Sequence, residues 1–477
     1  MKFIGRNDII EDMESLWRKR TASLVSCKGR RRIGKSRLIA EFAKRTAKRF
    51  IRIEGLPPRP GMDNRAQLDA FAKALSRETK SERVCFDSWH DAFLSLFSKV
   101  RKGERTVVLL DEISWMGAYD ADFPGYLKMA WDEFVDPDLN LIVFLCGSVS
   151  AWIERNILGS TGFVGRLSRN YTIGELSPCE CLGFWGRKAP RLQPGEILDV
   201  LSVCGGIPKY LEEIDPSLSA DENIRRLCFT DTGTLFGDFK DIFSGVFGEG
   251  AAQKRRILEL LADRSLNLSE LSKALKVAPN GHLAEALSEL SLSGFITPAE
   301  GLNPATGRQS RTGHYRLRDN YTRFYLHYIL PNERAIKSGT FRFTSMEGLP
   351  GWSAIMGLQF ENLVLNNATR LLPLLGIGNS VVRSISPYRN ERNSRRGGCQ
   401  VDLLIQTQRT AYVVEVKRRR EIGAEVEAEV EEKIRRIPFG RGMSVRTALV
   451  YDGHLDPAVE GGGFFDALIP SSELLKI

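Results

Sequence analysis

The chain has 477 residues, of which 42% are hydrophobic and 27% are charged, and its formal net charge is +9. This length is too great for one hydrophobic core and predicts about three or four domains, while the composition excludes a disordered or fibrous protein. The moderate positive charge is compatible with nucleic-acid binding but does not require it.

Neither a metal-binding cysteine pattern nor a membrane span is evident from the sequence. The eight cysteines are scattered, and the closest pair, Cys179 and Cys181, lacks C-x-x-C spacing, so we expect no zinc. The beginning of the chain lacks the apolar run of a secretion signal, and the longest apolar stretch, Leu139 to Cys146, is too short to span a bilayer. These features predict a cytoplasmic protein without membrane association.

Residues 1–175 alternate short apolar runs with amphipathic stretches, a pattern typical of a parallel sheet flanked by helices. The expected strands are Ser23–Cys27, Phe50–Glu54, Thr106–Leu110, Leu141–Cys146 and Tyr171–Ile173. Residues 176–250 lose this pattern, and prolines and glycines interrupt helix-like stretches there. For this second segment we expect a small helical lid.

A phosphate-binding motif follows the first expected strand. The run from Gly29 to Ser36 fits the spacing G-x-x-x-x-G-K-[ST] and leads into a helix-like stretch. Lys35 is expected to reach the β- and γ-phosphates of ATP, and Ser36 to hold Mg²⁺. The alternative is a chance match in a strand-to-helix turn. The expected ATP-binding residues here are Gly29, Arg32, Ile33, Gly34, Lys35, Ser36 and Arg37.

Two adjacent carboxylates end the apolar run that begins at Thr106. Asp111 is expected to bind Mg²⁺ through its water shell, and Glu112 to polarise the attacking water. The next expected strand ends close to Ser148, which is either a sensor of the γ-phosphate or the N-cap of the helix that follows.

Together these motifs resemble the archaeal-type ATPase family, a branch of the AAA+ and STAND-like P-loop proteins. The resemblance covers roughly residues 1–330 and includes Phe3-Ile4-Gly5-Arg6 and Gly205-Gly206-Ile207-Pro208. It implies that Gly5 and Arg6 lie near the adenine and ribose, and that Pro208 contacts the nucleotide. In AAA+ proteins a trans-acting arginine precedes the last core strand. Arg166 is therefore either such a residue in a homo-oligomer or an ordinary solvated arginine.

Residues 251–330 have the element order of a winged helix-turn-helix. The expected helices are Gln253–Asp263, Leu268–Leu275 and His282–Ser293, and a two-stranded wing includes Phe295–Thr297 and His314–Leu317. Basic residues fall on or near this wing, where they would reach a DNA backbone. They are Arg308, Arg311, Arg316 and Arg318.

Residues 331–477 begin with a linker that contains prolines and glycines, and the segment after it contains a second set of candidate catalytic residues. Strands are expected at Gln400–Ile405, Ala411–Val416 and Arg446–Tyr451. Strand alternation places Glu415 and Lys417 on one face of an apolar strand. Metal-assisted phosphodiester cleavage explains these polar groups if Asp402 and Glu415 bind Mg²⁺ and Lys417 positions or activates water. Glu361, on an upstream helix-like stretch, would then orient a metal ligand.

This arrangement resembles the PD-(D/E)xK nuclease superfamily, in particular the domain of unknown function that accompanies many archaeal-type ATPases. Val401 stands before Asp402, where many active members carry other residues. The alternatives are a Glu-x-Lys pair that faces solvent on an edge strand and a metal-free relative of the nuclease fold. Basic clusters around the carboxylates favour DNA as the partner. They are Arg389, Arg392, Arg395 and Arg396 before Asp402, and Arg418, Arg419 and Arg420 after Lys417.

The predicted fold class is therefore α/β, with four parts. They are a P-loop ATPase core (1–175), a helical lid (176–250), a winged helix-turn-helix (251–330) and a restriction-endonuclease-like domain (331–477). The preferred function is an ATP-binding and ATP-hydrolysing protein that controls a DNA-binding, DNA-cleaving C-terminal half. The alternatives are a STAND-like switch with a non-catalytic last domain, and a partner loader without nuclease activity.

Overall fold

The protein is described by a computed structural model that covers residues 2–19, 21–135, 139–148, 150–247, 250–309, 313–378, 381–390 and 397–476, with the side chains of 150 and 244–246 left out. The chain divides into two compact units, Met1–Glu175 and Leu176–Ile477. Each unit has its own sheets and is described separately. No helix in the described part of the chain combines the length and the apolar character needed to cross a bilayer.

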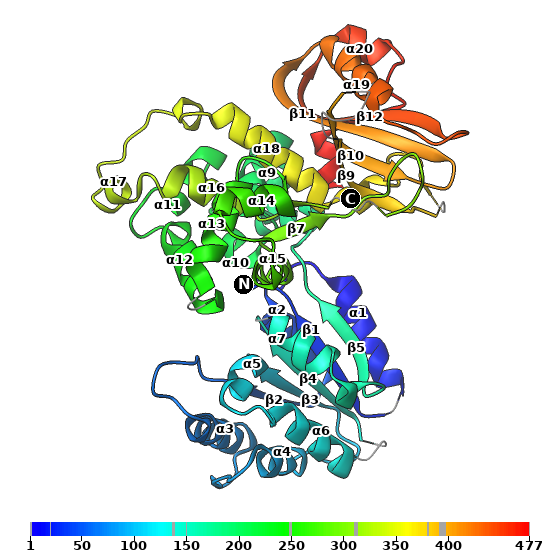
Figure 1. The fold of residues 1–477 in the computed structure, drawn as a ribbon. Helices are drawn as coiled ribbons and strands as arrows, with labels where there is room; N and C mark the ends of the chain where they lie inside the picture. The colour runs from blue at the N-terminus through cyan, green and yellow to red at the C-terminus, as the bar shows by residue number, and fades with distance from the viewer. Residues whose placement is uncertain are drawn as a thin grey trace. The chain divides into compact units, whose positions relative to one another are not determined.

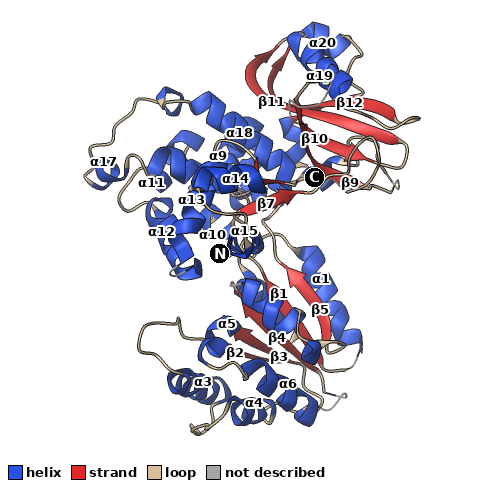
Figure 2. Ribbon diagram, in the orientation of Figure 1, coloured by secondary structure: helices blue, strands red, loops and turns tan. Residues whose placement is uncertain are grey.

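The first unit contains a parallel five-stranded sheet in the order β2-β3-β4-β1-β5 (Figures 1 and 2). Every residue of β3 and β4 is buried, because a parallel sheet is covered on both faces and its strands become continuous apolar runs. The strands are β1 (Ser23–Lys28), β2 (Arg49–Glu54), β3 (Thr106–Asp111), β4 (Leu141–Gly147) and β5 (Leu167–Thr172).

Helices with apolar stripes cover the two faces of this sheet. On one face, Val108 and Leu110 of β3 join a core with α3, α4 and α6. On the other face, Phe144 of β4 meets Phe42 of α2 edge to face. Asp63 and Ser88 cap the amino ends of α3 and α4. The helices of the unit are α1 (Asn7–Ser15), α2 (Lys35–Thr46), α3 (Asn64–Thr79), α4 (Trp89–Phe97), α5 (Ile113–Met116), α6 (Phe123–Phe134) and α7 (Ser150–Ile153).

The second unit begins with helices and continues into a small antiparallel sheet. Its first helices are α8 (Pro178–Cys181), α9 (Pro194–Cys204), α10 (Pro208–Leu211), α11 (Ala220–Cys228) and α12 (Thr234–Phe247). There follow α13 (Ala251–Leu261), β6 (Leu266–Asn267), α14 (Leu268–Leu275), α15 (Gly281–Leu292), β7 (Ile296–Ala299) and β8 (His314–Leu317). The small sheet has the order β6-β8-β7. Asn267 and Glu270 form a capping box that starts α14 directly after β6.

A mixed five-stranded sheet completes the second unit, in the order β13-β12-β11-β10-β9. The strands β9, β10 and β11 are antiparallel, whereas β12 and β13 run parallel to β11. The helix α18 packs on β11, and α19 connects β11 to β12. The elements are α16 (Asn320–Phe324), α17 (Glu333–Lys337), α18 (Trp352–Asn366), β9 (Ser384–Asn390), β10 (Cys399–Gln406), β11 (Thr410–Ile422), α19 (Glu425–Arg436), β12 (Ser444–Leu455), α20 (Pro457–Gly461) and β13 (Ala467–Pro470).

The α/β class and the parallel sheet confirm the expectation from sequence, with four differences in the strands. The last strand of the first unit is Leu167–Thr172, so it begins four residues before the expected start at Tyr171. The small sheet has a third strand, β6, which has two residues and carries no alternation to detect. β9 and β13 were not expected, because both are edge strands whose side chains are mostly half-buried.

Candidate functional site

The loop between β1 and α2 has a backbone that its sequence makes possible. Gly29 has φ 149°, and a Cβ at this position would lie 2.4 Å from the carbonyl oxygen of Ile173. Gly34, with φ 85°, starts α2 from a left-handed conformation, which glycine adopts at little cost. Arg32 is also left-handed, with φ 68°. The loop therefore has the close turns of a phosphate-binding loop.

Two cations hold this loop from inside. The Lys35 ammonium donates to the carbonyl oxygens of Gly29, at 2.9 Å, and Arg30, at 3.0 Å. The buried guanidinium of Arg6 donates to the carbonyl oxygens of Ile33, at 2.6 Å, and Gly174, at 3.0 Å. Arg6 therefore fastens the loop to the end of the unit. Its expected proximity to adenine and ribose, shared with Gly5, stays a prediction.

A hydroxyl, a carboxylate and a guanidinium meet beside the loop, at the carboxyl ends of the strands. The Ser36 hydroxyl donates to Asp111 Oδ1 at 2.9 Å, and Arg52 of β2 donates to Asp111 Oδ2 at 2.8 Å. A hydroxyl oxygen and a carboxylate at this spacing fit the oxygen ligands that Mg²⁺ takes beside phosphates. Arg37 lies on the first turn of α2, with its side chain exposed.

Glu112 is held by Ser148. The Ser148 hydroxyl lies 2.9 and 2.8 Å from the two carboxylate oxygens of Glu112, and the Ser148 amide donates at 3.1 Å. Glu112 itself has φ 50°, an unusual conformation for a residue with a Cβ. The two roles expected for Ser148 did not include this one.

Arg52 and Glu54 of β2 lie beside the Asp111 carboxylate, and neither residue was predicted from the sequence. Arg52 and Glu54 alternate along β2, so both side chains lie on one face of the strand. Burial, together with the negative charges of Asp111 and Glu112, raises the pKa of Glu54. The alternation of polar and apolar residues at the end of β2, Arg-Ile-Glu, could have predicted that these two side chains lie on one face.

Arg166 lies at the opposite edge of the sheet. It precedes β5, which runs parallel to β1, so it sits at the amino ends of these strands, whereas the loop follows their carboxyl ends. Its guanidinium forms two bonds of 2.7 Å with the Asp132 carboxylate and lowers the pKa of Asp132 to about 2. The structure therefore does not bring Arg166 to the loop of its own chain. Pro208 belongs to the second unit, where it begins α10.

Three carboxylates predicted at the C-terminal site line one hollow of about 590 Å³. Asp402 comes from β10, Glu415 from β11 and Glu361 from α18. The Val416 amide donates to Asp402 at 2.8 Å. Burial and the nearby charges of Glu415 and Glu361 raise the pKa of Asp402 well above its ordinary value. The pKa of Glu361 is also raised, by burial and then by Glu415.

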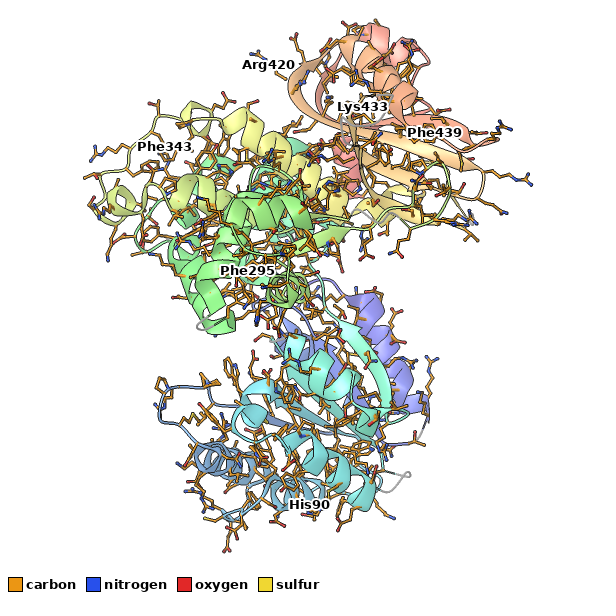
Figure 3. The ribbon with its side chains drawn as sticks, in the orientation of Figure 1. His90, Phe295, Phe343, Arg420, Lys433 and Phe439 are labelled. Carbon is orange, nitrogen blue, oxygen red and sulfur yellow. The ribbon has the colours of Figure 1, made fainter. Side chains whose placement is uncertain are left out.

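Two lysines neutralise the most buried of these carboxylates. Lys417 lies 2.9 Å from Glu415, as the strand alternation predicted. Lys433 of α19, labelled in Figure 3, donates to both Glu415 oxygens at 2.7 and 2.6 Å. Burial lowers the pKa of Lys417, but the charges of Glu415 and Glu429 outweigh burial and raise it. Lys433 was missed, because α19 carries acids and bases on many faces and nothing local marks this one.

The hollow contains side chains that can bind a metal, but they are not arranged as a metal site. Among the described residues, no three carboxylate, histidine or cysteine side chains are already grouped as metal ligands. Oxygen donors of the kind that Mg²⁺ prefers line the hollow, but Lys433 takes the position beside Glu415 that a cation would need. A metal bound at Glu415 would therefore compete with Lys433 for this carboxylate.

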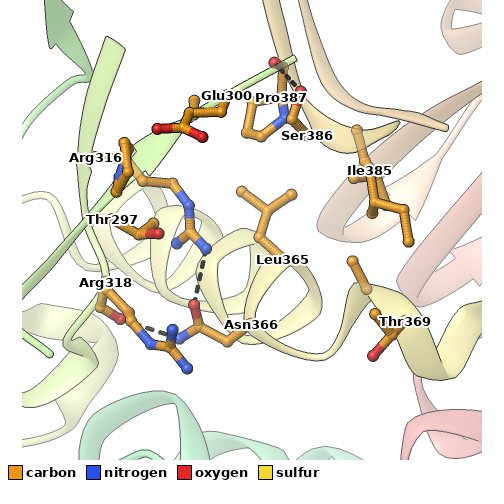
Figure 4. A pocket seen from close by; sticks show the side chains of 14 residues that line it. Thr297, Glu300, Arg316, Arg318, Leu365, Asn366, Thr369, Ile385, Ser386 and Pro387 are labelled. Carbon is orange, nitrogen blue, oxygen red and sulfur yellow. Dashed lines mark hydrogen bonds between the residues drawn. The ribbon is translucent and has the colours of Figure 1, made fainter. Parts of the chain in front are cut away.

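Several predicted basic residues are used inside the second unit. Arg316 donates to Asn366 of α18 at 2.9 Å (Figure 4). It also donates to Asn362 of the same helix. Arg418 pairs with Asp199 of α9 and with Asp452 of β12. Arg311, Arg392, Arg395 and Arg396 lie outside the described residues.

The fold and the loop define a mixed α/β protein with a glycine-rich loop at the carboxyl edge of a parallel sheet. No protein-family model matches the sequence. An uncharacterized protein of Methanocaldococcus jannaschii is 22% identical over 365 residues, which are 76% of each chain. The Walker-type ATPase PABY2304 of Pyrococcus abyssi is similar over 68% of this chain and 96% of its own, with 16% identity and a TM-score of 0.42. The ORC2 protein of Aeropyrum pernix is similar over 71% and 95%, with 14% identity and a TM-score of 0.41. These similarities are too distant to assign a family or a function.

Proposed function

We propose that the chain binds ATP with Mg²⁺ at the loop Gly29–Ser36 and hydrolyses it. The observation that carries this proposal is the meeting of Lys35, Ser36 and Asp111 at one edge of the sheet. A lysine held by loop carbonyls can move onto phosphate oxygens, and a hydroxyl 2.9 Å from a carboxylate can share a metal ion with it. A chance match to the motif in an ordinary strand-to-helix turn would not require this lysine, hydroxyl and carboxylate to lie together.

Each residue has a defined task in this proposal. The amides of the loop and of the first turn of α2 bind phosphate oxygens. Lys35 neutralises the β- and γ-phosphates, and Ser36 holds Mg²⁺, with Asp111 acting on the metal's water shell. Glu112 orients the attacking water once Ser148 releases it. Mg²⁺ supplies charge neutralisation on the phosphates.

We further propose that the second unit binds DNA and cleaves it with a divalent metal. The order α13-β6-α14-α15-β7-β8 is that of a winged helix-turn-helix, a DNA-reading motif. Glu361 forms no hydrogen bond or ion pair with any described residue, although it lies in the same hollow as Asp402 and Glu415. The charges of Arg323 and Arg316 act on Glu361 without contacting it, and a divalent metal bound in the hollow would add the direct cation contact that this carboxylate lacks.

A second candidate function is a STAND-like switch in which the last domain is non-catalytic. The contacts of Glu112 with Ser148 and of Glu415 with Lys433 favour it, because both candidate catalytic carboxylates are occupied by the protein itself. In a switch, slow hydrolysis would time a conformational state, and the second unit would bind DNA or a protein without cutting it.

One preparation tests these proposals in two assays. ATP turnover is measured with and without DNA, and plasmid nicking is measured with Mg²⁺ or Mn²⁺. Turnover lost in Lys35→Ala, together with nicking lost in Asp402→Ala and Glu415→Ala but kept in Lys35→Ala, supports an ATPase with a nuclease domain. Turnover without any cleavage across DNA forms and metals favours the switch. A rate of ATP turnover that is the same with and without DNA contradicts control of the second unit by ATP.

A further inference from the structure

A second hollow adjoins the carboxylate site. It has a volume of about 230 Å³ and shares Glu361 and Gln400 with the larger hollow. Its walls come from two parts of the second unit that are distant in sequence. One wall is the segment after α13 with β8 and α16, and the other is α18 with β9 and β10. The hollow is therefore built only when the proposed winged helix and the C-terminal sheet pack together.

The charged side chains that line this second hollow are mostly cationic. Four arginines face two carboxylates there. The arginines are Arg264, Arg316, Arg323 and Arg389, and the carboxylates are Asp263 and Glu361. Asp263 also pairs with His327, at 3.2 Å. The arginines outnumber the carboxylates, and this excess of positive charge favours an anion in the hollow.

Arg323 is a buried cation at the back of the hollow. Only 6% of its surface is exposed. Its guanidinium donates to the carbonyl oxygens of Ala262, at 2.8 Å, and Leu317, at 3.4 Å, and to Gln359 Oε1 at 3.0 Å. Burial lowers its pKa to about 10, although Glu361, Asp319 and Asp263 act in the opposite direction. A guanidinium buried mainly against neutral acceptors is costly, and a bound anion would offset part of that cost.

The other arginines differ in how firmly they are held. Arg316 is fixed to α18 by Asn366 (Figure 4) and by Asn362. Arg389 donates to the carbonyl oxygen of Ser265, at 2.9 Å, and lies 3.4 Å from Glu270. Arg264 is exposed and forms no hydrogen bond or ion pair with the described residues. Arg264 is therefore the arginine that can be replaced with the least damage to packing.

The size of the hollow limits what it holds. Binding sites for small molecules usually have volumes of about 300–1,000 Å³, so a hollow of about 230 Å³ is small for a whole nucleotide. A single phosphate group fits this volume, and arginine is the side chain whose geometry best matches phosphate oxygens.

We propose that this hollow binds a backbone phosphate of the DNA strand whose neighbouring phosphodiester lies at Glu361, Asp402 and Glu415. The winged-helix segment thereby supplies the phosphate clamp of the C-terminal site. This inference rests on the proposed function of the second unit as a DNA-binding nuclease. It adds the position of a second contact with the strand.

The test measures DNA binding by the full chain without cleavage. Fluorescence anisotropy of a labelled single-stranded DNA is recorded in EDTA without ATP, for the wild type, Arg264→Ala and Arg264→Glu. Arg334→Glu is the matched control, because Arg334 is exposed on α17, lies outside the hollow and makes no side-chain bond with described residues. Thermal melting checks that all variants are folded.

The expected result is a Kd raised by about tenfold in Arg264→Glu and less in Arg264→Ala, with Arg334→Glu close to the wild type. The slope of log Kd against log salt should fall by about one in Arg264→Ala, because one phosphate contact is lost. Equal affinities for wild type and Arg264→Glu would overturn the clamp and leave DNA binding intact. Absence of binding by the wild type would overturn both the clamp and the DNA-binding function. An equal loss in Arg334→Glu would show general charge attraction and would also overturn the clamp.

Discussion

The Ser148 hydroxyl is bound to both carboxylate oxygens of Glu112, at 2.8 and 2.9 Å, and the Ser148 amide adds a third contact. Ser148 follows β4 and Glu112 follows β3, two adjacent strands of the parallel sheet. The carboxylate that is proposed to orient water is therefore held by its own protein. Under the proposed role of Glu112, ATP binding has to break this contact before hydrolysis.

Ser148→Ala removes the hydroxyl and should raise ATP turnover by about tenfold at saturating ATP, because a hydrogen bond to a charged group contributes about 1.5–3 kcal/mol. Nucleotide affinity should stay close to that of the wild type. Ser148→Thr keeps the hydroxyl and serves as the control. A fall in kcat of a hundredfold in Ser148→Ala would instead assign Ser148 to sensing the γ-phosphate.

Glu112→Gln should lower kcat for ATP by about 10²–10⁴-fold, the usual contribution of a positioned base, while ATP still binds. Glu54→Gln is the matched control, because Glu54 is a nearby acid on β2 with a raised pKa. It should keep most of the turnover. Measurement of kcat together with equilibrium binding of a labelled ATP analogue separates the two effects. Equal losses of kcat in both variants would show that turnover depends on the negative charge at this edge of the sheet and not on Glu112 in particular.

Much of the first unit could be predicted from sequence, because its signals are local. The apolar runs that became β1, β3 and β4 are continuous, and the loop motif stands directly between β1 and α2. The contact between Ser148 and Glu112 could not be predicted in the same way, since these residues are 36 positions apart. Their meeting depends on the order of the strands in the sheet, which the apolar pattern does not specify.

The second unit was harder to predict for the same physical reason. The Glu-x-Lys alternation placed Glu415 and Lys417 on one face of β11, and the structure has them in contact. Lys433 reaches Glu415 from α19, and Arg316 reaches Asn366 from β8. Both contacts arise from packing between elements, so a reading of each element by itself did not predict that Arg316 contacts α18 and gave Lys433 no role.

A mixing experiment tests whether Arg166 acts on a neighbouring chain. Arg166→Ala and Lys35→Ala should each lose most turnover, and an equimolar mixture should recover part of it, because some interfaces then join an intact loop to an intact arginine. Asp132→Ala is the control, since it removes the bidentate partner of Arg166 but keeps the guanidinium. Unchanged turnover in Arg166→Ala, in a protein shown to oligomerise, would contradict the assignment.

Asp402→Asn should stabilise the second unit at neutral and alkaline pH. Burial and the charges of Glu415 and Glu361 raise the pKa of Asp402, so the folded state binds this proton more tightly than the unfolded state. The stabilising effect of the bound proton is complete below the unfolded pKa and is lost as the pH rises through the folded pKa. Asparagine can still accept the bond from Val416.

Thermal melting of wild type and Asp402→Asn across pH checks this sign. The Tm of the variant should exceed that of the wild type at pH 8, and the difference should shrink toward pH 4. Asp466→Asn, at an exposed acid that accepts a bond from the Thr447 amide, is the control and should not show the same trend. A difference that grows as the pH falls would contradict the raised pKa.

Lys433→Met should destabilise the metal-free protein and make its stability depend on divalent metal. Glu415 is 1% exposed, and removal of one partner of a buried ion pair costs about 3–5 kcal/mol. Lys417 still contacts Glu415 at 2.9 Å, so the loss should fall at the lower end of this range. Because Lys433 no longer competes for Glu415, Mn²⁺ should raise the Tm of the variant more than that of the wild type.

Lys209→Met is the control, because it breaks an exposed pair with Glu213. Its Tm should stay close to that of the wild type with or without metal. Equal responses to Mn²⁺ in wild type and Lys433→Met would mean that no cation replaces Lys433 at Glu415, which favours the switch over the nuclease.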